Sequence, residues 1–423
     1  MRSNSFVLKG DLCDSLDSKH LRPLENGYLV CVEGLCAGTF PSLPEQYAAL
    51  PLFDYTGKLV TPGLTDLHVH APQYAFRGLG MDLELLEWLS TNAFPEEARY
   101  KALDYADKAY RAFVDALRRG PNTRACIFAT LHRPATELLM DLLEDTGLVT
   151  LVGKVNMDRD CPDDLREADA GTSLAETRRW IGETAHKYTR TGAILTPRFV
   201  PSCTDELMKG LGELAAEYKL PVQSHLSENR GEVELVHSLC PGAAFYGDAY
   251  DRVGLFNERT IMAHCVLSGD AEIARMKANG VYVAHCPQSN TNLASGVAPA
   301  RRYLDEGLHM GLGSDVAGGA SLSIFRAMAD AIQVSKLRWR LQDDALAPLT
   351  VPEAFWLGTA GGGAFFGKVG RFEKGYECDA VVLDDGRLAA PRPLTVEQRV
   401  ERAVYLSEDR DVVGKFVRGR EIV

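Results

Sequence analysis

Residues 61–70 read TPGLTDLHVH and form the first of eight short runs of β-branched or apolar residues in the central part of the chain. From Thr61 to Gly367 these runs alternate with stretches whose apolar residues recur with the helical period of about 3.6. This alternation is typical of an α/β fold with a parallel sheet and crossover helices. Since a closed barrel has eight such strands, the sequence predicts a (β/α)8 TIM-like barrel. The eight runs end near His70, Thr130, Asn156, Val200, His225, His264, Cys286 and Asp315.

Two of the expected crossover helices have clear boundaries and a continuous apolar face. One stops at Gly120, and the other follows a cap signal at Ser202 and Asp205 and stops before Pro221. A face of this kind packs against a sheet, so its residues belong to the core and not to a cofactor site. The apolar positions are Leu103, Ala106, Tyr110, Phe113 and Leu117 in the first helix and Leu207, Leu211, Leu214 and Tyr218 in the second.

The two ends of the chain have a different pattern. Residues 27–40 and 373–385 are short strand-like runs broken by glycine, and residues 411–423 lack a helical period. Two strand-like ends that are distant in the sequence are expected to pair with each other. We therefore predict two domains: a small β-sandwich from residues 1–61 and 369–423, and a barrel over residues 62–368.

Composition and charge exclude several classes of protein. The 423 residues are 46% hydrophobic, 25% charged and 8% aromatic, close to an average globular chain, which excludes disorder, collagen and coiled coil. The formal net charge is −12, so a polyanion such as DNA is repelled on average, although a free base remains a possible ligand.

Cysteine spacing and hydropathy bear on the compartment. The ten cysteines contain no CxxC pair, a pattern that suits a reducing cytosol. No run reaches the roughly 18 apolar residues of a membrane span. The first 20 residues carry charges throughout, unlike a secretory leader, so we expect a cytoplasmic protein.

The histidines indicate a metal site. His68 and His70 are two residues apart on a predicted strand, so their side chains point to the same side and can share one ion. An HxH pair alone is a weak signal. The ends of the fifth, sixth and eighth runs add His225 in QSHLSE, His264 in MAHC and Asp315 in GLGSDV, and barrel active sites lie at that end of the strands. Three or four imidazoles with one carboxylate suit zinc, or less specifically iron, with room for a bound water.

Glu228 lies three residues after His225, just beyond the predicted strand end. There a carboxylate can overhang a metal ion without ligating it, which suits a proton shuttle. Hydrolysis at a carbon that bears an amine needs a hydroxide nucleophile and a group that moves a proton to the leaving nitrogen. We expect Glu228 to move that proton and Asp315 to accept the first proton of the water. The alternative for Glu228 is a solvated carboxylate at a helix start.

The remaining candidates carry less weight. His285 in AHCPQSN ends the seventh run and either lines the pocket or orients its loop. The cysteines that follow His264 and His285 are expected to be small buried apolar residues. The segments GLGSDVAGG and TAGGGAFFG lack the spacing of a phosphate-binding loop. Surface or packing roles are expected for His20, His132, His186, His237 and His309.

The run PGLTDLHVH, with the later His225 and His264 and the GSDV aspartate, resembles the amidohydrolase superfamily of metal-dependent hydrolases. The resemblance covers the barrel and both strand-like ends, and it implies that residues 62–368 form the hydrolase domain. Within the superfamily, long segments resemble the guanine deaminases: HAPQYAFRGLGMDLELLEWLSTNAFPEE, TPRFVPSC, QSHLSENRGEVE, AHCPQSN and GLGSDVAGG.

This resemblance implies a homodimeric enzyme that hydrolyses guanine to xanthine and ammonia at one zinc ion. His264 matches a position that either ligates the metal or hydrogen-bonds to its bound water, and Glu228 resembles the catalytic acid and base. The metal ligands that the resemblance implies are His68, His70, His225 and Asp315, with His264 as a further candidate. The implied substrate-binding residues are Gln73, Arg198, Phe199, His225 and Glu228.

Guanine suits these side chains chemically. Its carbonyl can accept a hydrogen bond from Arg198, its ring nitrogens can bond to Gln73, and its face can stack on Phe199. The alternative for Arg198 is a pair with a carboxylate of the barrel. One metal is expected because binuclear relatives carry a lysine at the end of the fourth strand, where LTPRFV has none. Lys154 precedes the end of the third strand and is expected to form a buried structural pair.

Three alternatives stay open at this point. In the first, the metal site catalyses the same reaction on another aminated heterocycle, such as a triazine, a pterin or an oxidised purine. In the second, the barrel binds no metal and is a non-catalytic interaction protein. The segment after Gln73, residues 74–95, is either a lid over the base or a packed helix.

Overall fold

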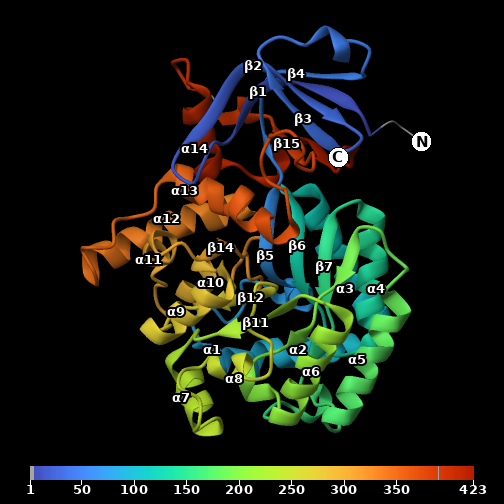
Figure 1. The fold of residues 1–423 in the computed structure, drawn as a ribbon, viewed down its shortest axis with the longest axis vertical. Helices are drawn as coiled ribbons and strands as arrows, with labels where there is room; N and C mark the ends of the chain where they lie inside the picture. Colours follow the sequence, from blue (N-terminus) through green and yellow to red (C-terminus); the bar gives the residue numbers. More distant parts are fainter. Residues whose placement is uncertain (1–3, 389) are drawn as a thin grey trace.

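The computed structural model describes residues 4–388 and 390–423 and consists of a central α/β part and a sheet at one end of it (Figure 1). Every pairing between strands of the central part is parallel, in the orders β5-β6-β7-β9, β8-β10 and β11-β12-β13-β14. The strands are β5 Leu64–His70, β6 Asn122–Phe128, β7 Val149–Gly153, β8 Val155–Asn156, β9 Thr191–Ala193, β10 Thr196–Pro197, β11 Val222–Leu226, β12 Thr260–His264, β13 Tyr282–His285 and β14 His309–Leu312.

Helices follow most of these strands and cover the outside of the sheets (Figure 1). Their apolar faces contribute to one large hydrophobic core that is shared with the strands. The helices are α1 Leu85–Trp88, α2 Phe94–Ala98, α3 Leu103–Arg119, α4 Arg133–Thr146, α5 Ala170–Thr184, α6 Asp205–Tyr218, α7 Arg230–Leu239, α8 Asp248–Asp251, α9 Asp270–Asn279, α10 Pro287–Asn292, α11 Ala300–Asp305, α12 Ile324–Leu341, α13 Val351–Trp356 and α14 Val396–Leu406.

Each predicted run contains strand, but two ends differ from the prediction. The fourth run ends at Pro197 and not at Val200, because residues 200–202 form a 3-10 turn that contains Pro201, which has no N–H to donate to a sheet. The eighth strand ends at Leu312, so Asp315 lies in the loop that follows it. The third and fourth runs are each divided into two short strands.

Both expected crossover helices are confirmed as α3 and α6, but Leu103 and Tyr218, which were predicted to belong to the core, are 48% and 36% exposed at the ends of these helices. The cap of α6 was predicted wrongly. Its N-cap is Thr204, whose side chain accepts a hydrogen bond from Leu207 N at 3.2 Å, while Asp205 is the first helical residue. A Thr side chain at that position satisfies one of the free N–H groups of the first turn, whereas Asp205 contributes through the helix dipole.

The two ends of the chain pair with each other in a seven-stranded sheet of order β17-β16-β15-β4-β1-β2-β3. The contact between the ends is the antiparallel pairing of β4 with β15. These pairings describe one sheet, so the second layer of a sandwich stays a prediction. Residues 1–3 and 389, which the predicted small domain includes, lie outside the described residues. The strands are β1 Phe6–Ser15, β2 Leu21–Val32, β3 Leu35–Phe40, β4 Leu52–Pro62, β15 Ala380–Leu383, β16 Val412–Val417 and β17 Arg420–Glu421.

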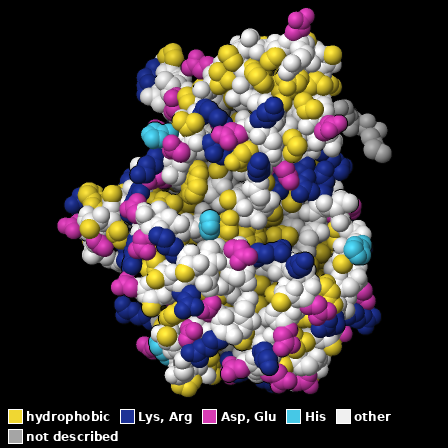
Figure 2. All heavy atoms as spheres, in the orientation of Figure 1, with side chains coloured by type: hydrophobic (Ala, Val, Ile, Leu, Met, Phe, Trp, Pro, Cys, Tyr) yellow, Lys and Arg dark blue, Asp and Glu magenta, His cyan; other side chains and the backbone are white. Residues whose placement is uncertain are grey.

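Surface features agree with the composition. On the face shown in Figure 2, acidic and basic side chains are interspersed, without a large patch of one sign. Among the described residues, no helix has both the length and the apolarity that crossing a membrane requires.

Arg124 joins the central part to the terminal sheet. Its side chain is fully buried in β6, where Nε donates to Asp379 Oδ2 at 2.7 Å and Nη2 donates to Glu377 Oε2 at 2.5 Å. Both carboxylates belong to the segment that leads into β15. Removing one partner of a buried charge pair leaves the other charges without compensation, which is strongly destabilising.

We therefore predict that Arg124→Met lowers the free energy of unfolding by about 3–5 kcal/mol. A matched control is Arg111→Met, because Arg111 is 63% exposed and pairs with Asp107 across the surface of α3. The control substitution should lower the free energy of unfolding by at most about 1 kcal/mol. Chemical denaturation measures both, and equal losses in the two variants would contradict the structural role of Arg124.

Candidate active site

A cavity lies at the carboxyl ends of the central strands. Its polar lining contains residues from both halves of the barrel sequence, and its apolar lining comes largely from α1 and the turn after it. The polar residues are His70, Gln73, Arg198, His225, Glu228, His264 and Asp315, and the apolar ones are Leu85, Trp88, Leu89, Phe199 and Leu293. The structure thus brings most of the predicted site residues together in one place.

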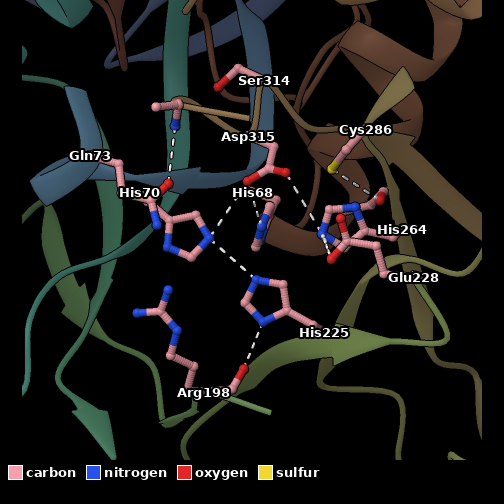
Figure 3. Close-up of polar contacts among 12 residues, drawn as sticks. His68, His70, Gln73, Arg198, His225, Glu228, His264, Cys286, Ser314 and Asp315 are labelled. Carbon is pink, nitrogen blue, oxygen red and sulfur yellow. Dashed lines mark hydrogen bonds and ion pairs between the residues drawn. The ribbon is translucent and has the colours of Figure 1, made fainter. Parts of the chain in front are cut away.

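Imidazole and carboxylate groups that line this cavity, together with His68, converge on one another (Figure 3). His70 Nε2 lies 3.2 Å from His225 Nε2. Asp315 Oδ1 lies 3.1 Å from His68 Nε2 and 3.5 Å from His70 Nε2. The other oxygen of Asp315, Oδ2, lies 3.7 Å from His264 Nε2. Each of these five side chains therefore has a possible ligand atom within 3.7 Å of that of another of the five.

The residues fit a metal ion. Two ligands of a tetrahedral ion, each about 2.0–2.1 Å from it, lie about 3.4 Å apart, which is close to the separations between these nitrogen and oxygen atoms. His68 is fully buried, its Nδ1 has no hydrogen-bond partner among the described residues, and its Nε2 faces Asp315. Groups able to hold an ion are His68 with His225 and His264, His68 with His70 and Asp315, and His264 with Cys286 and Asp315.

Hydrogen bonds orient two of the imidazoles. His225 Nδ1 donates to the backbone oxygen of Arg198 at 2.6 Å, and His264 Nδ1 donates to Asn290 Oδ1 at 2.9 Å. In each ring the other nitrogen, Nε2, then faces the common centre as an acceptor, which is the tautomer that a metal ligand needs. His264 and Asp315 also have positive φ angles of 73° and 45°. Strained backbone of this kind is often found at functional sites.

The protonation states suit metal binding. Burial lowers the pKa of His70 and of His225 well below the usual value, and the neighbouring His68 lowers both further. Burial alone would raise the pKa of Asp315, but the nearby His68 and His264 lower it more, so its net shift is downward. Neutral imidazoles and an ionised carboxylate are the forms that bind a metal ion.

Glu228 lies beside the cluster with the opposite electrostatic character. Its Oε2 lies 3.3 Å from His264 Nε2, and its Oε1 accepts a bond from Ser295 Oγ at 3.4 Å. Burial raises the pKa of Glu228 well above its usual range, and the carboxylates of Glu232 and Asp315 raise it further. A carboxyl group of raised pKa beside an ionised one is the arrangement that general acid and base chemistry uses.

The start of α7 fixes the position of Glu228. Glu232 Oε2 accepts bonds from the backbone N–H groups of Glu228 at 2.9 Å and Asn229 at 3.3 Å, as part of a capping box. Tyr246 donates to the other oxygen of Glu232 at 2.7 Å. The segment that carries Glu228 is therefore held by a helix cap, and Glu228 is not the solvated carboxylate of the alternative interpretation.

The three expected base-recognition residues line the cavity. Gln73 follows β5 in the turn η2, Ala71–Phe76, while Arg198 and Phe199 follow β10. Arg198 pairs with the buried Glu97 of α2, which is the kind of carboxylate partner considered as its alternative role. Gln73 Nε2 also donates to Glu97, at 2.8 Å. Glu97 was not predicted as a site residue.

Other predictions have mixed outcomes. His285 is fully buried, neither of its ring nitrogens has a hydrogen-bond partner among the described residues, and it does not line the cavity. Lys154 forms the expected buried pair, with Nζ 2.6 Å from Glu167 Oε1. Residues 74–95 contain α1 and a π-helical turn, Leu89–Ala93, and three of their side chains line the cavity, so both alternatives for this segment stay open. Cys286 is buried as expected, yet it is close enough to His264 and Asp315 to be a ligand.

The site residues that sequence reasoning missed act through contacts across the fold. Glu97 is 24 residues from Gln73 and 101 from Arg198. Asn290 is 26 residues from His264, and Ser295 is 67 from Glu228. No periodicity or motif spacing links such pairs. The available signal was position in segments that resemble the guanine deaminases, because Glu97 ends HAPQYAFRGLGMDLELLEWLSTNAFPEE and Asn290 ends AHCPQSN.

Comparison with known proteins places this site in a family. The profile of the amidohydrolase family matches residues 59–422. Guanine deaminase of Dictyostelium discoideum is 38% identical over 88% of this chain and 84% of its own, and guanine deaminase of Mus musculus is 37% identical over 86% and 82%. The crystal structure of guanine deaminase from C. acetobutylicum, with guanine bound in the active site, is 44% identical with a TM-score of 0.96, over 99% of this chain and 100% of that one. The chain therefore belongs to the amidohydrolase family, and within it to the guanine deaminases.

We predict that the purified protein binds one Zn²⁺ ion per chain, used here as the probe ion, and that His68→Ala weakens this binding at least about 100-fold. Loss of a residue that only hydrogen-bonds to a metal ligand already lowers the metal affinity about 10–100-fold. His309→Ala is the control. His309 is the exposed first residue of β14, where it stacks on Tyr282 and lies away from the site. Competition with a chromophoric chelator measures the affinity. Equal affinities of the two variants would exclude His68 as a ligand.

Proposed function

We propose that this protein hydrolyses guanine to xanthine and ammonia. The observation that carries the proposal is that the histidine and Asp315 cluster shares one cavity with Gln73, Arg198 and Phe199. A site of this kind combines groups that hold a metal ion with groups that bond to a planar, polar ring. The similarity to guanine deaminases, one of them with guanine bound in its active site, supports guanine as the ring.

We propose that the ion is one zinc per chain, with iron as a possible substitute. The residues that would hold it are His68, His70, His225 and Asp315, with His264 either as a further ligand or as a hydrogen-bond partner of the water. When bound, the ion would lower the pKa of a water molecule and so supply the nucleophile. The fourth strand has no lysine at its end, which favours one ion over two.

The proposed chemistry exchanges the exocyclic amine of guanine for oxygen. Asp315, ionised and within 3.1 Å of His68, accepts a proton from the attacking water. Glu228, whose pKa is raised by burial, donates a proton to the departing nitrogen. As the new carbon–oxygen bond forms and the carbon–nitrogen bond breaks, ammonia leaves, and the proton held by Asp315 restores Glu228.

Substrate recognition follows from the other wall of the cavity. Arg198 donates to the carbonyl of guanine, Gln73 bonds to ring nitrogens, and Phe199 packs on the ring. Leu85, Trp88 and Leu89 cover the opposite side with apolar surface. Such a covering excludes water from the reacting atoms, which strengthens every hydrogen bond inside the cavity.

Two alternatives have less support. A different aminated heterocycle, such as a triazine or a pterin, would use the same cluster, but the relatives that match over most of the chain are named guanine deaminases. A non-catalytic barrel does not need to keep a complete set of metal ligands beside a carboxyl group of raised pKa. Comparison of kcat/KM for guanine with that for each rival heterocycle distinguishes the substrates.

We predict rapid ammonia release from guanine by the metal-loaded protein, with the ultraviolet change to xanthine, and its loss after chelation. Glu228→Gln should keep the metal but lower kcat by about two orders of magnitude or more, because an amide cannot carry the proton. Glu234→Gln, an exposed neighbour on α7, is the control and should match the unchanged protein.

Two results would contradict this proposal. Turnover near the unchanged rate in Glu228→Gln would remove Glu228 from the mechanism. Absence of guanine turnover by protein that holds its zinc would move the substrate to another heterocycle.

We further propose that the chain is organised as a closed (β/α)8 barrel over residues 62–368 with a small β-sandwich domain from residues 1–61 and 369–423, and that it acts as a cytoplasmic homodimer. The pairing of β4 with β15 supports a joint domain from both ends. Light scattering should give the mass of two copies of the chain. A monomeric mass would overturn the dimer.

A further inference from the structure

Glu97 does not line the cavity, but it contacts two residues that do, Gln73 and Arg198. Its side chain is almost completely buried in α2, with the residue 1% exposed. One carboxylate oxygen, Oε1, accepts from Gln73 Nε2 at 2.8 Å, and the other, Oε2, pairs with Arg198 Nη1. One carboxylate therefore bridges a side chain that follows β5 and a side chain that follows β10.

The amide of Gln73 is held in one orientation by its two partners. The backbone N–H of Ala317, two residues after Asp315, donates to Gln73 Oε1 at 3.1 Å. The carboxylate of Glu97 can only accept when it is ionised, and the N–H of Ala317 can only donate. Flipping the amide would place like groups against each other at both ends. Gln73 thus presents a defined remaining N–H and a defined lone pair to the cavity.

Arg198 is equally constrained. It is 3% exposed, its guanidinium lies over the ring of Phe94 at 5.1 Å from the ring centre, and Glu97 is the carboxylate that pairs with it. A buried guanidinium without an anion is unfavourable, so the negative charge of Glu97 keeps the side chain in place. With Nη1 engaged by Glu97, the other N–H groups remain as donors toward the cavity that Arg198 lines.

We propose that Glu97 is a positioning residue that determines substrate specificity, because it sets which donors and acceptors Gln73 and Arg198 offer to the bound ring. This inference rests on the proposed function. With Arg198 held as a donor, the cavity selects a heterocycle that has a ring carbonyl over one that lacks it. A site with a donor for one polar group of its ligand rejects an analogue that lacks this polar group. The buried donor of the protein is then left without a hydrogen-bond partner.

The neighbouring Glu96 provides a matched control. It lies one residue earlier on α2 and is also buried, but it bonds to Tyr105 Oη and lies 3.6 Å from Arg99 Nε. Neither Glu96 nor these two partners lines the cavity. The same Glu→Gln change can therefore be made at adjacent positions, with only one of them connected to the substrate-binding side chains.

The experiment uses two purines that differ by one ring carbonyl. Hypoxanthine has the carbonyl and purine lacks it, and neither carries the amine that leaves from guanine. Their inhibition constants against guanine turnover are measured for the metal-loaded protein and for Glu97→Gln, Glu97→Asp and Glu96→Gln, together with kcat and KM for guanine and the zinc content of each.

In the unchanged protein hypoxanthine should bind at least about 10-fold more tightly than purine. Glu97→Gln should bring this ratio close to 1 and raise KM for guanine by about 10–100-fold, at unchanged zinc content, because the charged partner of Arg198 is lost. Glu97→Asp keeps the charge but draws it back from Gln73 and Arg198, so it should lower the ratio, though by less than Glu97→Gln does. Glu96→Gln should leave the ratio unchanged.

Several outcomes would overturn the proposal. One is an unchanged ratio in Glu97→Gln, which includes an equal weakening of both purines, the effect that loosening of the fold alone would have. Another is the absence of any preference in the unchanged protein. If Glu97→Gln does not fold, the ratio in Glu97→Asp decides, since a shortened carboxylate in a positioning role must shift it and a purely structural one must not. Absence of guanine turnover in the unchanged protein would instead contradict the proposed function.

Discussion

The carboxylate of Asp66 is the interaction on which the site depends. It accepts bonds from Ser314 N at 3.0 Å, Ser314 Oγ at 2.5 Å and His68 N at 3.1 Å. These bonds join the first strand of the barrel to the loop after the last one, beside the contact of Asp315 N with His68 O at 2.8 Å. His68 and Asp315, which are far apart in the sequence, are thereby held in contact. Burial raises the pKa of Asp66 to about 7, and its hydrogen bonds with Ser314 and His68 limit that rise.

Around this connection, burial assigns different protonation states to neighbouring groups. It keeps the imidazoles of His70 and His225 neutral and raises the pKa of Glu228, while the surrounding histidines keep Asp315 ionised. One water-poor environment therefore supplies metal ligands, a proton acceptor and a proton donor. The same burial makes the pair of Glu97 with Arg198 strong, so the chemistry and the choice of substrate both depend on exclusion of water.

Much of the fold and of the central cluster could be predicted from the sequence, because these features have a local signature. The two-residue spacing of His68 and His70 places both on one side of a strand, and the parallel strands bring His225 and His264 to the same end. Glu97 has no such signature, since its contacts are set by how α2 packs across the cavity. The strand end at Pro197 was missed because the local pattern there is short. The helix α14, Val396–Leu406, was missed although its local signals are present, namely a capping box of Thr395 with Gln398 and an apolar face.

The central claim is that imidazoles and Asp315 hold a single metal ion, and X-ray absorption spectroscopy of the zinc-loaded protein tests it most directly. The account predicts a first shell of only nitrogen and oxygen at about 2.0–2.1 Å, with imidazole scattering. It also predicts no second metal at about 3.5–4 Å. A sulfur at about 2.3 Å would place Cys286 in the shell, and a metal–metal distance would make the site binuclear. Either result would contradict the account.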